Sequence, residues 1–63
     1  MYEESLIRKI TAGTGAIRRG DKSPEEANLG KMLNTLKSMN LGMYEELLEK
    51  YKAAVATYES ISK

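Results

Sequence analysis

This 63-residue chain contains no cysteine, histidine, tryptophan or phenylalanine. Without cysteine there is no disulfide, no thiolate nucleophile and no zinc–thiolate site. Without histidine the chain lacks the usual metal ligand and the usual general base near neutral pH. The serine and threonine hydroxyls have no imidazole to activate them. We therefore expect no enzymatic activity, no metal site and no cofactor.

The length allows one small domain, residues 1–63. In chains this short the hydrophobic gain roughly equals the conformational entropy lost, so a disulfide, a metal or another subunit usually completes the fold. Composition removes the first two, and we expect the chain to associate with itself, as a homodimer or larger, and with an unidentified protein. No uncharged stretch is long enough to span a membrane and no signal-peptide pattern opens the chain, so we expect a cytoplasmic protein.

The first expected helix covers residues 2–19. Two glutamates lie in its first turn and two arginines in its last turn, as the helix dipole favours. Gly20 follows, a residue that can take the left-handed conformation that ends helices. Gly13 and Gly15 weaken the middle of the helix. Either another helix packs closely at Gly13 or the helix is kinked, and the sequence leaves both readings open.

The second expected helix covers residues 24–39. Ser23 suits the N-cap, Pro24 the first helical position, and Glu26 completes a capping box. We expect Asn40 to end this helix in the left-handed conformation, with Leu41 folded back onto its last turn. The apolar face has helical spacing: Leu29, Met32, Leu33, Leu36 and Met39.

The third expected helix covers residues 43–61 and carries Tyr44, Tyr51 and Tyr58 at heptad spacing, with Leu48 and Val55 widening the stripe. Tyrosine buries a large ring while its hydroxyl needs a polar partner, which enriches it at interfaces. The same stripe could form the rim of the chain's own core. We favour the interface and predict that these five residues form a protein-interaction surface.

No segment alternates with period two and no hairpin turn is present, so we expect no strands. Short linkers between three helices predict an all-α fold, an antiparallel three-helix hairpin or bundle completed by self-association into a helical oligomer. The expected function is that of a small, non-enzymatic interaction or regulatory protein that binds another macromolecule.

Two alternatives remain. The first is a nucleic-acid-binding regulator whose basic side chains contact phosphates, although a net charge of +1 is small for that role. Its candidate contacts are Arg18, Arg19, Lys22, Lys31 and Lys37. The second is an oligomer that binds a small ligand between subunits near Gly13, where the missing side chain would leave room.

Overall fold

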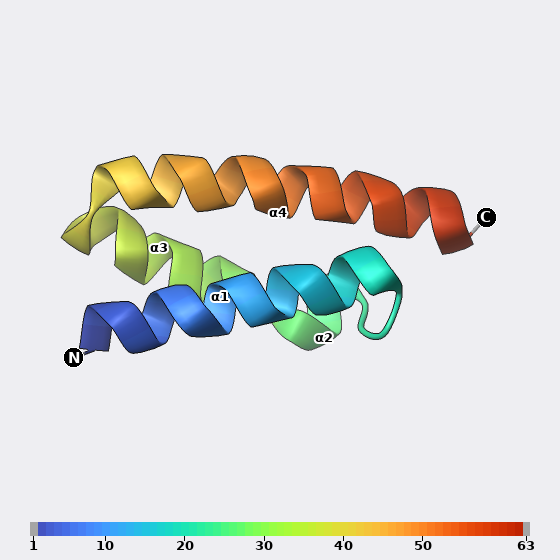
Figure 1. Ribbon diagram of the computed structural model, residues 1–63, viewed down its shortest axis with the longest axis horizontal. Coiled ribbons are helices and arrows are strands. Elements are labelled where there is room, and N and C mark those ends of the chain that lie inside the picture. The colour runs from blue at the N-terminus through green and yellow to red at the C-terminus, as the bar shows by residue number, and fades with distance from the viewer. Residues whose placement is uncertain (1, 63) are drawn as a thin grey trace.

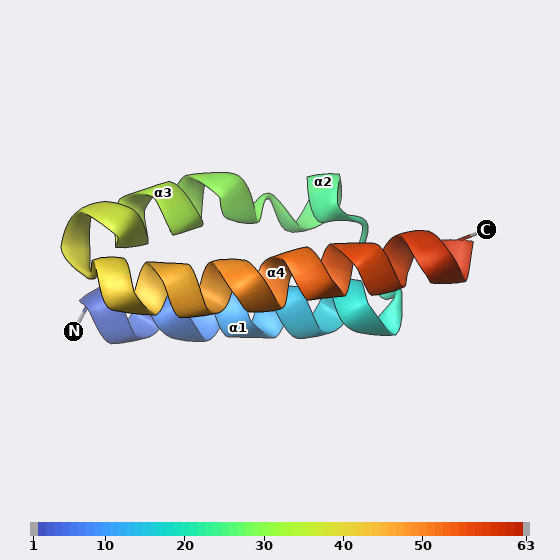
Figure 2. The ribbon, with the colours of Figure 1, turned by 90° about the horizontal axis from the view of Figure 1, so that it is seen from above.

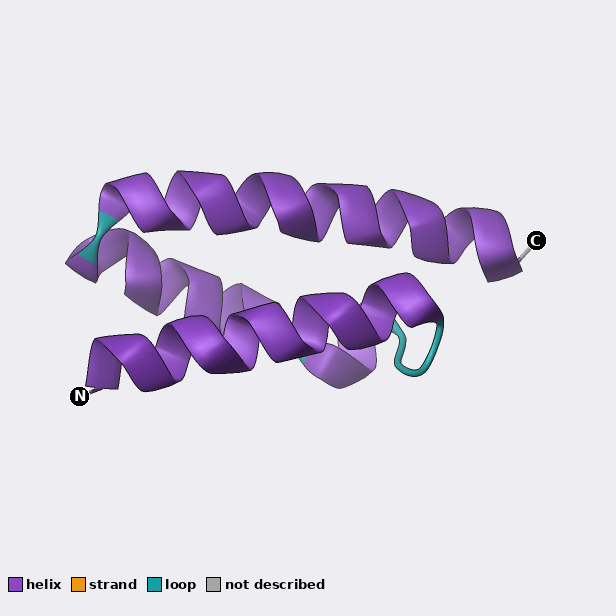
Figure 3. Ribbon diagram, in the orientation of Figure 1, coloured by secondary structure: helices purple, strands orange, loops and turns teal. Residues whose placement is uncertain are grey.

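The computed structural model describes residues 2–62, and within this range it is helical with no strand (Figures 1 and 3). This confirms the all-α prediction. Four helices replace the three expected ones. They are α1 (Tyr2–Arg19), α2 (Pro24–Ala27), α3 (Leu29–Met39) and α4 (Leu41–Ser62).

The three long helices pack against one another pairwise. α1 and α4 run side by side in the same direction, and α3 runs back between their ends in the opposite direction (Figures 1 and 2). The single-turn α2 packs against α1 near the end of that helix. This arrangement produces three shallow faces, one between each pair of long helices, and the functional question is what each face can bind.

α1 is continuous from Tyr2 to Arg19, so the two glycines do not break it. Its end follows the prediction, because Gly20 has a φ of 83° in the left-handed region. The backbone N–H of Gly20 donates to the carbonyl of Ile17 at 3.0 Å. Arg19 then pairs with Asp21, Nε to Oδ2 at 3.0 Å, on the exposed turn that follows. Local chemistry therefore fixes this boundary.

The capping box at the start of α2 is confirmed. The backbone N–H of Glu26 donates to Ser23 Oγ at 3.1 Å, and the N–H of Ser23 donates to Glu26 Oε1 at 3.0 Å. These hydrogen bonds to the backbone and hydroxyl of Ser23 hold the pKa of Glu26 below its usual value. The carboxylate thus binds the helix start more strongly than its protonated form does.

Ser23→Ala is expected to lower the free energy of unfolding by about 0.5–2 kcal/mol, because it removes the N-cap acceptor.

The stabilisation that the Glu26 carboxylate contributes is complete above the ordinary glutamate pKa and is lost as the pH falls through the lowered pKa of the folded state. Glu26→Gln keeps an acceptor but does not titrate, so its stability should fall less than that of the wild type on acidification. Urea unfolding at neutral and acidic pH measures both effects. An identical pH dependence of the unfolding free energy in the wild type and Glu26→Gln would contradict the stabilising role assigned to the Glu26 carboxylate.

The helix expected over residues 24–39 is interrupted at Asn28, which corrects the prediction of one continuous helix. Asn28 has φ 49° and ψ 48°, the left-handed region that asparagine tolerates better than most residues. Its N–H donates to the carbonyl of Pro24 at 3.2 Å, which closes the short α2. The interruption places the next residue, Leu29, in the core at 1% exposure.

Asn40 also differs from its prediction. It has an extended backbone, with φ −153° and ψ 92°, and not the left-handed conformation. Its side-chain Oδ1 accepts a hydrogen bond from the N–H of Met43 at 3.1 Å, so Asn40 caps the start of α4. This capping moves the start of the last helix from residue 43 to Leu41, whose side chain is exposed.

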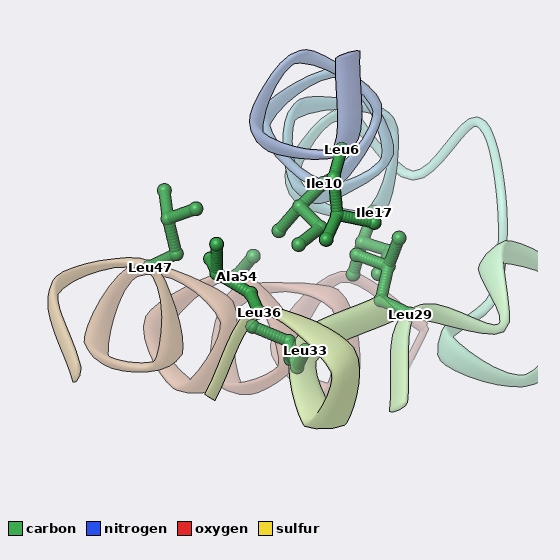
Figure 4. Close-up of a cluster of buried hydrophobic side chains, with 8 residues drawn as sticks. All are labelled: Leu6, Ile10, Ile17, Leu29, Leu33, Leu36, Leu47 and Ala54. Carbon is green, nitrogen blue, oxygen red and sulfur yellow. The ribbon is translucent and has the colours of Figure 1, made fainter. Parts of the chain in front are cut away.

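Side chains from α1, α3 and α4 meet in one buried cluster along the axis of the molecule (Figure 4). Ile10, Ile17 and Leu36 are fully buried at its centre. The other members are Leu6, Leu29, Leu33, Leu47 and Ala54. The cluster leaves the outer edges of the three faces to half-buried and exposed side chains. Among the described residues, no helix is both long and apolar enough to cross a membrane.

Candidate interaction surface

The predicted tyrosine surface (Tyr44, Leu48, Tyr51, Val55 and Tyr58) lies along one side of α4. All five side chains are half-buried and pack against the core cluster. They therefore form the rim of the chain's own core, as one of the two sequence readings held, and each still exposes part of its surface. The heptad spacing aligns the three rings along the helix. A partner that covered them would bury additional aromatic area without unfolding the chain.

A groove of about 510 Å³ runs between α3 and the first half of this surface. Tyr44, Leu48 and Tyr51 line it from α4. The opposite wall consists of Gly30, Lys31, Leu33 and Asn34 of α3. The volume lies within the range of ligand-binding clefts in proteins, and its mixture of aromatic, aliphatic and amide groups is typical of a site that binds a helix or peptide.

Lys37 contacts Tyr44, one of the residues that line the groove. Its ammonium nitrogen lies 5.6 Å from the centre of the Tyr44 ring, a cation–π arrangement. The contact holds the Tyr44 ring in a defined orientation at the start of α4. The phosphate contact predicted for Lys37 stays a prediction, since its side chain is exposed.

The tyrosine surface continues beyond α3. α3 has 11 residues and α4 has 22, so their lengths are about 16 Å and 33 Å at 1.5 Å per residue. The two helices run antiparallel from Asn40, so only the first half of α4 has α3 beside it (Figure 2). Val55 and Tyr58 lie in the second half, and Ile61, one turn later, is 59% exposed. The chain therefore covers only part of its own apolar stripe.

Gly30 and Asn34 are functional candidates that the sequence prediction missed. A Cβ added to Gly30 would meet no atom within 4 Å, so the missing side chain widens the groove opposite Tyr51 and Leu48. The two residues are four apart, which places them on one side of α3. That spacing was visible in the sequence. Nothing in it showed that this side of α3 would face the tyrosines.

Gly13 of α1 lies against the side chain of Leu29 of α3. A Cβ built there would be 2.7 Å from Leu29 Cδ2, nearer than side-chain atoms approach. The space left by the missing side chain is therefore filled by Leu29 of the same chain. A small ligand near Gly13 would have to use the shallow depression beside it, which includes Lys9, Ala12 and Met32.

The five basic side chains considered for phosphate binding are all exposed, and three of them border three different grooves. Arg18 borders the groove between α1 and α4, Lys22 the one between α1 and α3, and Lys31 the one between α3 and α4. Arg19 is paired with Asp21. A single basic patch at the tip between the first two helices is therefore limited to a few side chains.

Within residues 2–62, no three acidic side chains gather closely enough to hold a metal ion. No family model matches the sequence, and no match was found among curated proteins or among solved structures. The surfaces of the chain itself therefore carry the functional argument.

Proposed function

We propose that this protein is a small, non-enzymatic interaction protein that binds another macromolecule through the tyrosine surface and works as an oligomer of identical chains. The observation that carries the proposal is the apolar stripe of α4, which continues past the end of α3 because α4 has 22 residues and α3 has 11. A helix from a partner protein could lie in the groove beside Tyr44 and Tyr51 and extend along Val55 and Tyr58.

Tyrosine suits this role because its ring contributes a large contact area and its hydroxyl remains hydrated or bonds to the partner. The wall opposite the rings is low, since Gly30 has no side chain and leaves open space. A partner helix with an apolar stripe and small or acidic residues toward Lys31 would fit this groove. Nucleic-acid binding has weaker support, because the cations border three different grooves.

Gly30→Gln is expected to block the groove without harming the fold. The new side chain meets no atom at its Cβ, and replacing a helical glycine raises helix stability by roughly 0.5–1 kcal/mol. Capture from a nuclease-treated lysate of the host, quantified by mass spectrometry, should recover a partner protein with the wild type. Recovery should fall at least about tenfold with Gly30→Gln, since burial at the centre of an interface dominates binding energy.

The matched control is Gly15→Gln, another glycine replacement in a helix but on the face between α1 and α4. It should capture the same protein as the wild type does. Equal recovery with wild type and Gly30→Gln, or capture of no protein at all, would contradict the proposal. Recovery that depends on omitting the nuclease would favour the nucleic-acid alternative instead.

A further inference from the structure

The face between α1 and α4 lies away from the tyrosine surface and has a different character. A groove of about 260 Å³ runs along it, with mostly small side chains at its edges. Thr11, Thr14 and Gly15 line it from α1, and Ala53 and Ala54 from α4. Small residues on two neighbouring helices allow the backbone of further helices to approach closely. Such a stripe alone does not identify an occupant, and two further observations do.

The first observation is an unpaired hydroxyl. Thr14 is 9% exposed, and its Oγ1 is the one buried side-chain oxygen or nitrogen that has no hydrogen-bond partner among the described residues. An unpaired buried hydroxyl costs free energy, so native structures usually satisfy it. Thr14 lines the groove, but the oxygen itself exposes almost no surface, so a polar group of a molecule seated there would satisfy it only after the Thr14 side chain rotates toward the groove.

The second observation is the order of charges along this face. On α1, Glu4, Thr11 and Arg18 follow one another at seven-residue intervals and share one side of the helix. On α4, Glu46 is seven residues before the groove-lining Ala53, and Lys50 lines the groove itself. On α1 the acidic group therefore lies near the start and the basic group near the end, and on α4 Glu46 precedes Lys50 by one turn in the first half of the helix.

None of these four charged side chains forms an ion pair within the described chain, where Arg19–Asp21 is the salt bridge. Arg18 and Lys50 border the groove, and Glu4 and Glu46 lie beyond its edge. All four side chains are exposed. With the exposed Arg8, one turn after Glu4 on α1, the face carries two negative and three positive side chains. On such a surface a negative side chain precedes a positive one along each helix. A second copy packed antiparallel against it therefore places each negative side chain opposite a positive one.

The positions of these charged residues along the two helix axes agree with a single two-fold axis. The groove spans residues 11–18 of α1 and 47–54 of α4, so residue 11 of α1 is level with about residue 47 of α4. Glu4 and Arg18 lie about 10 Å on either side of Thr11 at 1.5 Å per residue. The midpoint of Glu46 and Lys50 is residue 48, only about 1.5 Å from that level.

We propose that a second copy of this chain docks on the α1–α4 face, related by a two-fold axis that crosses both helices near Thr11. α1 then packs antiparallel on the partner's α1 and α4 on the partner's α4, which forms two stacked layers of two helices each. Glu4 faces Arg18 of the partner subunit, and Glu46 faces Lys50 of the partner subunit. Arg8, one turn after Glu4, faces Gly15 of the partner subunit, where no side chain competes for space.

This inference rests on the oligomer in the proposed function and assigns it a surface other than the tyrosines. The dimer leaves the tyrosine surface open on both copies, so each could still bind its partner. A charge-paired interface also predicts that self-association weakens as salt rises, because screening acts on exposed ion pairs.

Two charge-reversed variants test the pairing. One is Glu4→Lys with Glu46→Lys, and the other is Arg18→Glu with Lys50→Glu. All four positions are exposed, so circular dichroism should show folded helices in both variants. By sedimentation equilibrium each variant alone should self-associate roughly 100-fold more weakly than the wild type, because all the facing pairs become repulsive. An equimolar mixture should regain a dimer that contains one copy of each.

Gly15→Gln and Gly30→Gln separate this inference from the proposed function. Gly15→Gln fills the α1–α4 groove and should give the mass of a single chain, whereas Gly30→Gln should keep the dimer. The inference is overturned if the wild type is monomeric, if both charge variants still dimerise alone, or if their mixture stays monomeric. If only Gly30→Gln lowers the mass, self-association belongs to the tyrosine surface and the proposed function stands without this dimer.

Discussion

Gly13→Val is expected to destabilise the fold by about 1–3 kcal/mol, the usual cost of adding atoms to a packed core. Its Cβ would lie 2.7 Å from Leu29 Cδ2 and 3.2 Å from Leu29 Cδ1. Leu29 is 1% exposed, so it cannot swing into solvent to make room. The added methyl groups would therefore push Leu29, and with it α3, away from α1.

Gly15→Val is the matched control, two residues away on the same helix. Its Cβ would meet only Arg19 Nη1 at 3.4 Å, the end of an exposed and flexible side chain. Both variants replace a helical glycine by valine, so propensity changes equally and the difference reports packing. Urea unfolding at low protein concentration and high salt, where the proposed dimer is dissociated in all variants, should show a clear loss for Gly13→Val and little change for Gly15→Val. Equal midpoints would contradict the close approach of α3 to α1.

Ile17→Ala is the second substitution with a large expected effect. Ile17 is fully buried between the three long helices (Figure 4). Truncating a buried isoleucine to alanine costs about 2–5 kcal/mol through lost burial and the cavity left behind. At roughly 0.05–0.15 kcal/mol per residue, a chain of this length has about 3–9 kcal/mol of stability in total. The variant should therefore be largely unfolded at temperatures where the wild type is folded.

The control for this truncation is Ile61→Ala near the end of α4. Ile61 is 59% exposed, so the same chemical change there should alter the free energy of unfolding by less than about 0.5 kcal/mol. Thermal unfolding followed by circular dichroism measures both. Similar melting temperatures for the two variants would show that the core of the fold is not where the structure places it.

The helix boundaries that the sequence predicted well are those set by contacts between close neighbours in the chain. The capping box at Ser23 and Glu26 and the left-handed Gly20 are of this kind. Asn28 and Asn40 were predicted wrongly because asparagine suits a helix interior, a left-handed turn and an N-cap almost equally. Packing decides between them: breaking the helix at Asn28 places Leu29 against Gly13.

The tyrosine side of α4 was predictable because heptad spacing places those rings together whatever the rest of the chain does. The opposite wall was not, since Gly30 and Asn34 face the tyrosines only through the register between α3 and α4. Thr14 illustrates the same limit. Threonine usually lies near the surface, and only the packing of α4 against α1 shows that this one is buried with an unpaired hydroxyl.

The central claim is that this chain, which has no cysteine to form a disulfide, works as an assembly of identical copies. Sedimentation equilibrium of the wild type over a range of micromolar to millimolar concentrations at low salt tests it most directly. The account predicts a mass that approaches twice the 7.0 kDa of one chain and falls as salt is added. A folded protein with the mass of a single chain at every concentration would contradict it.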